Sequence, residues 1–268
     1  GDLSPIAAPT APSELQPLIA ATNQVMQRLR HLLRHQKRFV RDASHQLRTP
    51  LAVLKTQVQS ALRGDMPAEQ ALHEISDTVD RATQLANQML ALAKVEQLRQ
   101  QSEPPITRLD EVLRTVALEI SPLIAQRDLD FGIHTEAAPV RAHEWMLREL
   151  TRNLLHNAVR HAPHGSELAV DLRCDAQHTA LTISDCGPGI EPELAARLFQ
   201  PFSAGDVRSG SGLGLAICQE IVQALGGSIT LTNRKRGTRI LGLDAVVRLP
   251  LAHHFASANH GNPAQLSE

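Results

Sequence analysis

The feature that most constrains the fold is a long run of apolar residues at helical spacing near the start of the chain. From Ser13 onward these residues recur at steps of three, four or seven, the repeat of one helix face. They are Leu15, Leu18, Val25, Leu29, Leu32, Phe39, Ala43, Leu47, Leu51, Leu54, Val58 and Ala61. The pattern predicts one helix of about 50 residues, far longer than the globular average of about 11 to 12.

A second helix is predicted after a break at residues 64–67. Pro67 suits a first helical position, and the apolar residues behind it alternate steps of three and four, which is typical of a heptad seam. The seam comprises Leu72, Ile75, Val79, Ala82, Ala86, Met89 and Ala93. Two helices with one apolar stripe each cannot enclose a core. We therefore expect the hairpin to pair with a second copy in a dimeric four-helix bundle.

One histidine on the first helix, His45, lies in the stretch FVRDASHQLRTPL. Pro50 lacks the backbone N–H that would bond the carbonyl of Gln46, so we expect the helix to bend beside His45. An imidazole is neutral and nucleophilic near pH 7, which makes an exposed histidine at a bend a candidate phosphoryl acceptor. Most single surface histidines are inert, so this interpretation depends on a phosphate-handling region elsewhere in the chain.

After a hinge at residues 101–105 the periodicity becomes mixed. Asp110 is expected to cap a helix. Helices are predicted at residues 110–126, 144–161, 193–199 and 213–225, and strands at 129–135, 167–173, 179–184, 228–232 and 238–249. Helices and hairpin-like strand pairs alternate irregularly, which predicts an α/β sandwich with helices on one side of a mixed sheet. Residues 251–268 are polar and patternless, and we expect a disordered tail.

Composition narrows the function classes. A net charge of −1 gives no reason to expect nucleic acid as a partner. Cys174, Cys186 and Cys218 lack metal-ligand spacing, and we interpret them as small apolar fillers in a reducing compartment. No apolar run approaches the roughly 20 residues of a membrane helix. The chain begins with Gly rather than Met, which suggests a soluble part of something larger.

The predicted helix at residues 144–161 has a polar face. Glu149, Asn153, Asn157 and His161 are spaced by four and therefore share that face. Such a face is normally only hydrated. Two asparagines and a glutamate could instead hold a hydrated Mg²⁺, which prefers oxygen ligands, while Arg160 and His161 could meet phosphate oxygens.

Two glycine-rich stretches follow. In TALTISDCGPGI a strand ends at Asp185, before Gly187 and Gly189, which indicates either an ordinary turn or a site where the carboxylate reads an adenine amine. In GSGLGLAICQEIV a glycine-rich loop leads into a helix, whose N-terminus can offer N–H groups to phosphates. The residues at that helix start are Gly210, Gly212, Leu213 and Gly214. The βαβ context of a Rossmann site and the Gly-Lys-Ser/Thr of a P-loop are both missing from the sequence.

In this order, the three stretches resemble the Asn box and two glycine boxes of the GHKL ATP-binding fold, and LFQPF, which ends at Phe202, resembles its Phe box. FVRDASHQLRTPL resembles the phosphoacceptor box of sensor histidine kinases. The resemblance covers roughly residues 15–250. It divides the chain into a lead-in (1–12), a HAMP-like linker helix (13–36), a dimerisation and phosphotransfer domain (37–100), the hinge (101–105), an ATP-binding domain (106–250) and the tail (251–268).

The resemblance implies an ATP- and Mg²⁺-dependent protein-histidine kinase that passes its phosphoryl group to an aspartate of a response regulator. The implied catalytic group is His45, Gln46, Arg48 and Thr49, with Gln46 standing where the family has an acidic residue. The implied Mg²⁺ residues are Glu149, Asn153 and Asn157. Arg160 and His161 would hold phosphates and Asp185 would read adenine, beside Gly187 and Gly189. Phe202 to Gly210 would form a lid, and Gly212, Leu213 and Gly214 would complete the nucleotide site.

The resemblance also implies that the intact protein is anchored in the bacterial inner membrane, with this chain as its cytoplasmic portion. Two alternatives remain open. One is a GHKL ATPase of the gyrase or chaperone type. The other is a dimeric scaffold or phosphatase-only protein, which Gln46 makes plausible. Incubation with γ-labelled ATP would separate the three by yielding phosphohistidine, free phosphate or neither.

Overall fold

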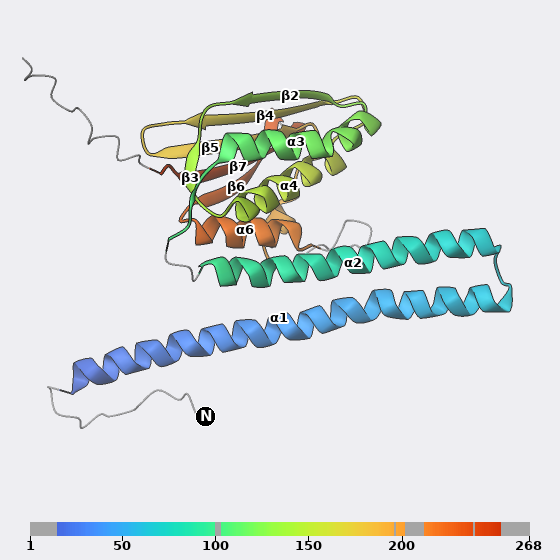
Figure 1. The fold of residues 1–268 in the computed structure, drawn as a ribbon, viewed down its shortest axis with the longest axis horizontal. Coiled ribbons are helices and arrows are strands. Elements are labelled where there is room, and N and C mark those ends of the chain that lie inside the picture. Colours follow the sequence, from blue (N-terminus) through green and yellow to red (C-terminus); the bar gives the residue numbers. More distant parts are fainter. Residues whose placement is uncertain (1–14, 100–102, 196, 202–211, 238, 253–268) are drawn as a thin grey trace, which may run out of the picture. The chain divides into compact units, whose positions relative to one another are not determined.

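The computed structural model describes residues 15–99, 103–195, 197–201, 212–237 and 239–252 (Figure 1). The chain divides into two compact units, residues 1–87 and 88–268. The first is helical and the second is built around a mixed sheet, so the predicted fold class is confirmed. Each unit is described by itself.

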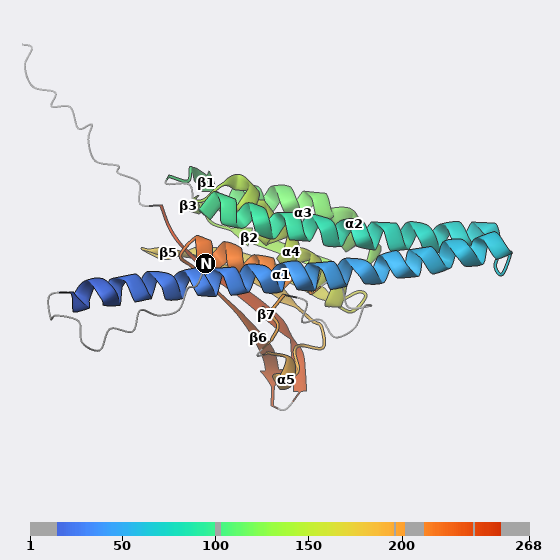
Figure 2. The same ribbon diagram turned by 90° about the horizontal axis from the view of Figure 1, so that it is seen from below.

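The first unit is a helical hairpin. Helix α1 (Gln16–Arg63) runs for 48 residues and continues through Pro50 without a break. It ends at Gly64, whose positive φ of 74° is a conformation that glycine adopts without strain. Helix α2 (Ala68–Arg99) returns alongside it and extends past the boundary of the unit (Figures 1 and 2). The predicted long helix and the break after it are both present.

The buried face of α2 differs from the predicted seam by one position. Within the first unit its buried residues are Ala71, Thr78 and Leu85, each seven residues after the last. Leu72 and Val79, which we placed in the seam, are 67% and 43% exposed. The physical reason is that contact with a single partner helix buries a narrow stripe. The apolar residues beside that stripe remain uncovered in one chain.

The second unit is a five-stranded sheet with helices on one face. Its strands run in the order β2-β4-β5-β7-β6, and only the β2–β4 pair is parallel. The elements are β1 (Ile106–Arg108), α3 (Leu109–Gln126), β2 (Asp130–Thr135), β3 (Pro139–Arg141), α4 (Glu144–His161), β4 (Glu167–Cys174), β5 (His178–Asp185), α5 (Pro192–Ala195), α6 (Gly214–Ala224), β6 (Ser228–Arg236) and β7 (Arg239–Pro250).

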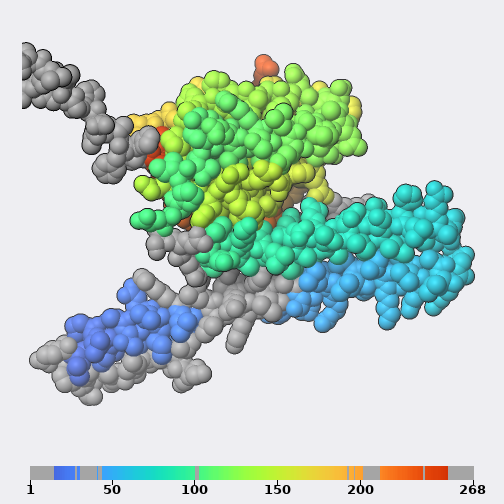
Figure 3. All heavy atoms as spheres, in the orientation of Figure 1, coloured from blue at the N-terminus to red at the C-terminus, as the bar shows by residue number. Residues whose placement is uncertain are grey.

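The core of this unit lies between the sheet and helices α3, α4 and α6, which gather on one side of it (Figures 1 and 2). Alternate residues of β4 and β5 point into this layer because side chains along a strand face opposite sides of the sheet. Completely buried members of the layer are Leu113, Leu147, Leu150, Leu155, Leu168, Leu172, Leu181 and Ile217. In the space-filling view, the green and yellow atoms of this unit lie closely against one another (Figure 3).

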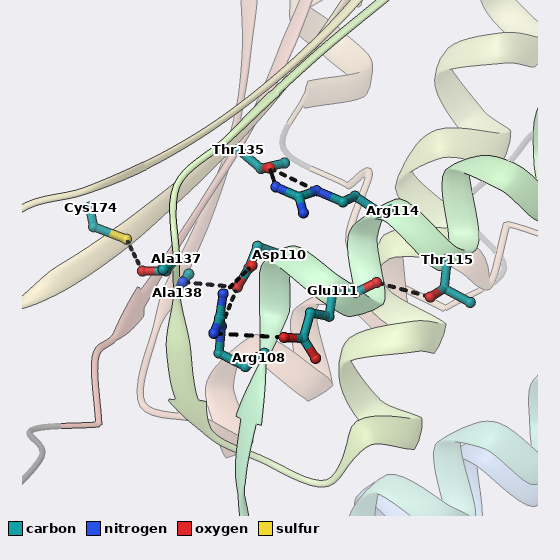
Figure 4. A network of polar contacts seen from close by, with 9 residues as sticks. All are labelled: Arg108, Asp110, Glu111, Arg114, Thr115, Thr135, Ala137, Ala138 and Cys174. Carbon is teal, nitrogen blue, oxygen red and sulfur yellow. Dashed lines mark hydrogen bonds and ion pairs between the residues drawn. The ribbon is translucent and has the colours of Figure 1, made fainter.

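The start of α3 is held by a buried carboxylate rather than by a cap. We predicted Asp110 as the cap, but the helix begins at Leu109, after an Arg108 whose side chain caps nothing. Asp110, 1% exposed, accepts two hydrogen bonds from Arg108 at 2.8 and 2.6 Å and one from the Ala138 N–H at 3.0 Å (Figure 4). The cap prediction is wrong because these partners from outside the helix occupy the carboxylate.

The three-residue strands β1 and β3 were not predicted. Strand β3 pairs with both ends of the sheet-containing part of the chain. Strand β3 pairs with β1 on one side. On its other side Val140 bridges to Leu251, and the Ala252 N–H donates to the Pro139 carbonyl at 2.9 Å. Leu251 and Ala252, which we assigned to the tail, are therefore ordered by backbone pairing. Residues 253–268 lie outside the described part of the chain.

Three smaller expectations also changed. The helix predicted at 193–199 is limited to α5, Pro192–Ala195, and the strand predicted to end at Thr232 continues in β6 to Arg236. Of the three cysteines, only Cys218 is a buried filler, because Cys174 and Cys186 keep part of their surface exposed. Across the residues that the structure describes, no helix is long and apolar enough to cross a membrane.

Candidate active site

The polar face of α4 brings two of the predicted metal residues together. The Asn153 side-chain amide donates to the Glu149 carboxylate Oε1 at 2.9 Å, and also to the Glu149 backbone carbonyl at 2.9 Å. The Arg152 guanidinium lies 3.7 Å from the other Glu149 oxygen and also pairs with Glu119 of α3. Asn157 follows one turn later and is partly exposed. These contacts orient the Glu149 carboxylate and leave the Asn153 Oδ1 atom for another partner.

That oxygen faces the beginning of α6. A Cβ atom on Gly214 would lie 3.1 Å from Asn153 Oδ1, so glycine at this position lets the two helices approach closely. Leu213 is buried just before α6, and Gly212 has a positive φ of 68°. The first N–H groups of an α-helix lack intrahelical partners and carry a partial positive charge. The candidate site therefore places side-chain oxygens of α4 beside the N-terminus of α6, an end that is suited to an anion.

Asp185 ends β5 and is almost fully buried, with 4% of its surface exposed. Its Oδ1 atom accepts the Gly187 N–H at 2.7 Å. Burial raises the pKa of the Asp185 carboxyl, and the Gly187 N–H and the nearby His161 oppose that rise. A buried carboxyl held in one orientation is suited to accept a hydrogen bond from one edge of a ligand.

The glycines after Asp185 allow close contact within the protein. A Cβ atom on Gly187 would lie 2.8 Å from Asp185 Oδ1 and 2.9 Å from the His161 carbonyl oxygen. A Cβ atom on Gly189, whose φ is +75°, would lie 2.6 Å from Asn233 Oδ1. On the side where their Cβ atoms would stand, the space is taken by α4 and β6.

The structure puts His161 at the Asp185 end of the site. Burial lowers the pKa of His161, the charge of Arg160 lowers it further, and the Asp185 carboxylate opposes both effects. His161 lies eight residues after Asn153, or about 12 Å along the axis of α4. One face of α4 therefore runs from the beginning of α6 at Asn153 to the loop after Asp185 at His161. The candidate site thus has a helix N-terminus at one end and a buried carboxyl at the other.

The predicted phosphoacceptor residues lie on α1, in the helical unit. His45, Gln46, Arg48 and Thr49 are all exposed. The Thr49 hydroxyl points back along the helix, 3.5 Å from the His45 backbone carbonyl. This exposure leaves the imidazole open to attack a group brought to it from solvent. Two further predicted site residues, Phe202 and Gly210, lie outside the residues that the structure describes.

Sequence reasoning missed two residues that contact the Asp185 loop. Asn233 of β6 bonds both backbone groups of Ile190, and Arg234 donates to the Asp185 carbonyl. Both lie beyond the predicted end of the strand at Thr232. The dipeptide Asn-Arg at a strand end matches no binding motif, so the sequence carried no signal for these two contacts.

Comparisons with known proteins match both parts of the chain. Residues 35–98 match the family model described as "His Kinase A (phospho-acceptor) domain", and residues 142–253 match "Histidine kinase-, DNA gyrase B-, and HSP90-like ATPase". The chain is 34% identical over 252 residues to the sensor protein QseC of Salmonella typhi, covering 91% of this chain and 54% of QseC. The chain thus spans about half the length of this curated relative.

Solved structures share the fold. The histidine kinase AdeS of Acinetobacter baumannii superposes with a TM-score of 0.65 at 24% identity, covering 78% of this chain and 98% of AdeS. The histidine kinase ThkA, in complex with the response regulator protein TrrA, gives a TM-score of 0.67 at 20% identity, covering 83% of this chain and 64% of ThkA. At these identities the two structures support the architecture described above.

Proposed function

Because the chain belongs to the sensor histidine kinases of two-component systems, we propose that it transfers the γ-phosphoryl group of ATP to His45 and then to an aspartate of a response regulator. One observation carries this proposal. A single chain combines an exposed histidine within the phosphoacceptor match with the α4–α6 site within the ATPase match. The phosphoacceptor match disfavours an ATPase of the gyrase or chaperone type.

In this proposal the nucleotide lies along α4. Asp185 accepts from the exocyclic amine of adenine, and its fixed orientation supports that role. The triphosphate lies towards the first turn of α6, beside Asn153. Arg160, Gly212 and Leu213 border the phosphates, as the family resemblance implies. The family resemblance assigns His161 to the phosphates as well, although its backbone lies beside Gly187 in the Asp185 loop.

Mg²⁺ fits the donors on α4. Glu149, Asn153 and Asn157 present the oxygen ligands that this ion prefers, and an ion that keeps several waters needs no complete protein cage. Among the described residues no three His, Cys, Asp or Glu side chains gather into a metal cluster. A bound Mg²⁺ would neutralise charge that develops on the phosphates. The contact between Asn153 and Glu149 holds the ligand side chains in place.

At the acceptor, a neutral imidazole nitrogen of His45 forms a bond to the γ-phosphorus as the bond to the ADP oxygen breaks. ADP leaves with that electron pair, and the imidazole must then lose the proton on its other nitrogen. The Gln46 side-chain oxygen can accept a hydrogen bond from that N–H but cannot take the proton near neutral pH. The proton therefore passes to water.

The chain is proposed to act as a dimer, with a response regulator as its second partner. Leu51 and Leu72 are exposed on the two helices of the hairpin and would be covered by a second copy. The relative of about twice this length supports a further segment in the intact protein, which we propose anchors it in the bacterial inner membrane.

The proposal is tested by incubating the chain with γ-labelled ATP and Mg²⁺. We expect acid-labile label on the protein, its loss in His45→Gln, and nucleotide affinity within about twofold of wild type in that variant, because the two sites belong to different units. His73→Gln, a second exposed histidine of the hairpin, is the matched control and should keep the label.

Other outcomes identify the alternatives. Label retained on His45→Gln would remove His45 as the acceptor. Release of free phosphate without labelled protein would indicate an ATPase, and neither product would indicate a scaffold. Asn157→Asp should weaken Mg²⁺-ATP binding because an added charge alters the metal shell. Unchanged affinity at saturating Mg²⁺ would remove Asn157 from the site.

A second activity, dephosphorylation of the regulator, is favoured by the position of Thr49. Its hydroxyl is exposed one turn after His45 and can orient a water towards a docked phosphoaspartate. Thr49→Ala should lower phosphatase activity much more than autokinase activity. Thr56 is also exposed, and its hydroxyl likewise donates to the backbone carbonyl four residues earlier, that of Ala52. Thr56→Ala should change neither the phosphatase nor the autokinase activity. Equal losses of both activities in Thr49→Ala would indicate that Thr49 only supports the helix near Pro50.

A further inference from the structure

Two adjacent residues of β6 hold both ends of the loop that begins at Asp185. The Asn233 side chain accepts the Ile190 N–H at 2.8 Å and donates to the Ile190 carbonyl at 2.8 Å, as a neighbouring strand would. Arg234 donates to the Asp185 carbonyl at 2.8 Å. The loop from Asp185 to Ile190 is therefore fixed by side chains that are more than 40 residues away in sequence.

A break in the sheet pairing lies directly after Arg234. The register between β6 and β7 shifts between Arg234 and Lys235, and such irregularities can re-aim a side chain. The second guanidinium nitrogen of Arg234 lies 3.5 Å from an Asp244 carboxylate oxygen. Asp244 therefore helps to hold Arg234 in the position from which it bonds Asp185.

The packing around these contacts leaves the loop little freedom. A Cβ atom on Gly189 would meet Asn233 Oδ1, and a Cβ atom on Gly242 of β7 would overlap the Asp185 carbonyl oxygen and the Arg234 guanidinium. The loop thus lies directly against β6 and β7. Because the Asp185 carboxylate is itself bonded to the Gly187 N–H, the position of the loop determines where that carboxylate points.

The other end of the nucleotide site is built from different contacts. Asn153 is oriented by Glu149 on the same helix and faces Gly214 of α6. Asn233 and Arg234 bond the Asp185 loop instead. A change in the β6 residues should therefore alter how the base is held while leaving the phosphate contacts intact.

We propose that Asn233 and Arg234 are positioning residues that set the selectivity of this site for adenine over guanine nucleotides. The inference rests on the proposed function, in which Asp185 reads the exocyclic amine of adenine. Guanine presents a carbonyl oxygen where adenine presents that amine, so a correctly placed carboxylate favours adenine and repels guanine. Discrimination by hydrogen bonds depends on accurate geometry, and it weakens when the loop can move.

The test measures the affinities of the full chain for the non-hydrolysable analogues AMPPNP and GMPPNP with Mg²⁺. Asn233→Ala should weaken AMPPNP binding about 10-fold, the effect of one or two net hydrogen bonds, and change GMPPNP binding less than twofold. Arg234→Met should act in the same direction. Arg234→Lys, which keeps one donor for the Asp185 carbonyl, should restore most of the selectivity.

Two exposed residues of the same strand serve as matched controls. Arg236→Met removes an arginine, and Thr232→Ala removes a polar side chain beside Asn233. Both should retain the wild-type preference for AMPPNP. Thermal unfolding of each variant checks that the α/β unit is folded. Arg234 is partly exposed, so its variants keep the proposal testable if Asn233→Ala does not fold.

Asp185→Ala, which removes the acceptor altogether, separates failure of this inference from failure of the proposed function. If Asp185→Ala keeps the wild-type selectivity, Asp185 does not read adenine, and both the adenine role and the inference are wrong. If Asp185→Ala loses the selectivity while Asn233→Ala and Arg234→Met keep it, only the inference is wrong. Equal weakening of both analogues in the β6 variants would also overturn it, because it would show a general structural role.

Discussion

The two units of the chain differ in whether one copy can complete its core. In the α/β unit, residues such as Leu147, Leu150 and Leu181 are completely buried between sheet and helices. In the hairpin, Leu51, Leu62 and Leu72 are each more than half exposed. A sheet covered by three helices encloses a layer of side chains, whereas two helices meet along one narrow stripe. The comparison shows where a single chain buries its own core and where it leaves apolar side chains uncovered for the second copy that we propose.

The candidate site residues of the two units also differ, in how firmly their neighbours hold them. Asp185 accepts the N–H of Gly187, and Asn153 donates to Glu149 of its own helix, so each side chain of the proposed nucleotide site is held in one orientation. His45 is exposed on a helix surface. A nucleotide site gains selectivity from rigid contacts. A phosphoacceptor must instead meet first a nucleotide and then a partner protein, which requires open access.

The largest expected effect comes from a matched pair of exposed leucines, one in each unit. Leu72→Lys should weaken dimerisation at least about 100-fold, because burying an unpaired charge in an apolar interface costs several kcal/mol. Leu118→Lys, on α3 and 74% exposed, should leave the dimer intact. Sedimentation equilibrium over a range of protein concentrations measures both. Equal dissociation by the two variants would mean that the uncovered hairpin stripe is not the dimer surface.

A second prediction concerns the α/β unit alone. Asp110→Asn should lower its free energy of unfolding by about 1–3 kcal/mol at pH 7, because a charge-assisted contact is lost from a buried site. Urea unfolding at several protein concentrations measures this, and the change should be independent of concentration. Asp171→Asn, which removes a surface pair with Arg173, should have a much smaller effect. Because the hairpin is proposed to dimerise, the outcome that would contradict a self-sufficient core is a difference between wild type and Asp110→Asn that changes with protein concentration.

The pH dependence of that variant has a definite sign. The hydrogen bonds from Arg108 lower the pKa of Asp110 below its ordinary value of 3.8. A carboxyl with a lowered pKa in the folded state stabilises the fold above its ordinary pKa, and this contribution is lost as the pH falls through the folded value. The difference in free energy of unfolding between wild type and Asp110→Asn should therefore persist as the pH falls to about 4. It should become smaller at lower pH.

The smallest effect is expected at the acceptor. Gln46→Glu should raise the rate of autophosphorylation about 3- to 30-fold. Positioned bases contribute about 10²- to 10⁴-fold in general, but phosphoryl transfer depends mainly on metal and alignment. The gain should appear at saturating ATP and shrink below about pH 4 to 5. Gln59→Glu, also exposed on α1, is the control. Matching single-turnover rates for Gln46→Glu and wild type across pH 6 to 8 would show that proton removal is not limiting.

Much of the fold could be predicted because its long elements have regular patterns. The bounds of α4, Glu144–His161, match the prediction, and α1 has the expected length. Strands β1 and β3 have three residues each, too few to show an alternating pattern. The role of Asp110 was mistaken because Ala138, its backbone partner, lies 28 residues away. Local spacing cannot report such a contact.

The candidate site divides in the same way. Residues spaced along one helix, such as Glu149 and Asn153, could be grouped from sequence because a helix fixes which residues share a face. Asn233 could not, since its partner Ile190 lies 43 residues away and contributes only backbone groups. Because any residue offers the same backbone groups, the identity of residue 190 gives no indication of that contact. Side chains that bond distant backbone are therefore the part of a binding site that sequence motifs leave out.

The pairing of β1 and Leu251 on opposite sides of β3 brings the two ends of the α/β unit close together. Neighbouring strands are separated by about 4.8 Å, so entry and exit lie roughly 10 Å apart. A few residues could join them, and new ends could be opened at an exposed turn such as Gly165. Because its two ends lie close together, the unit is suited to circular permutation and to insertion into a loop of an unrelated host protein.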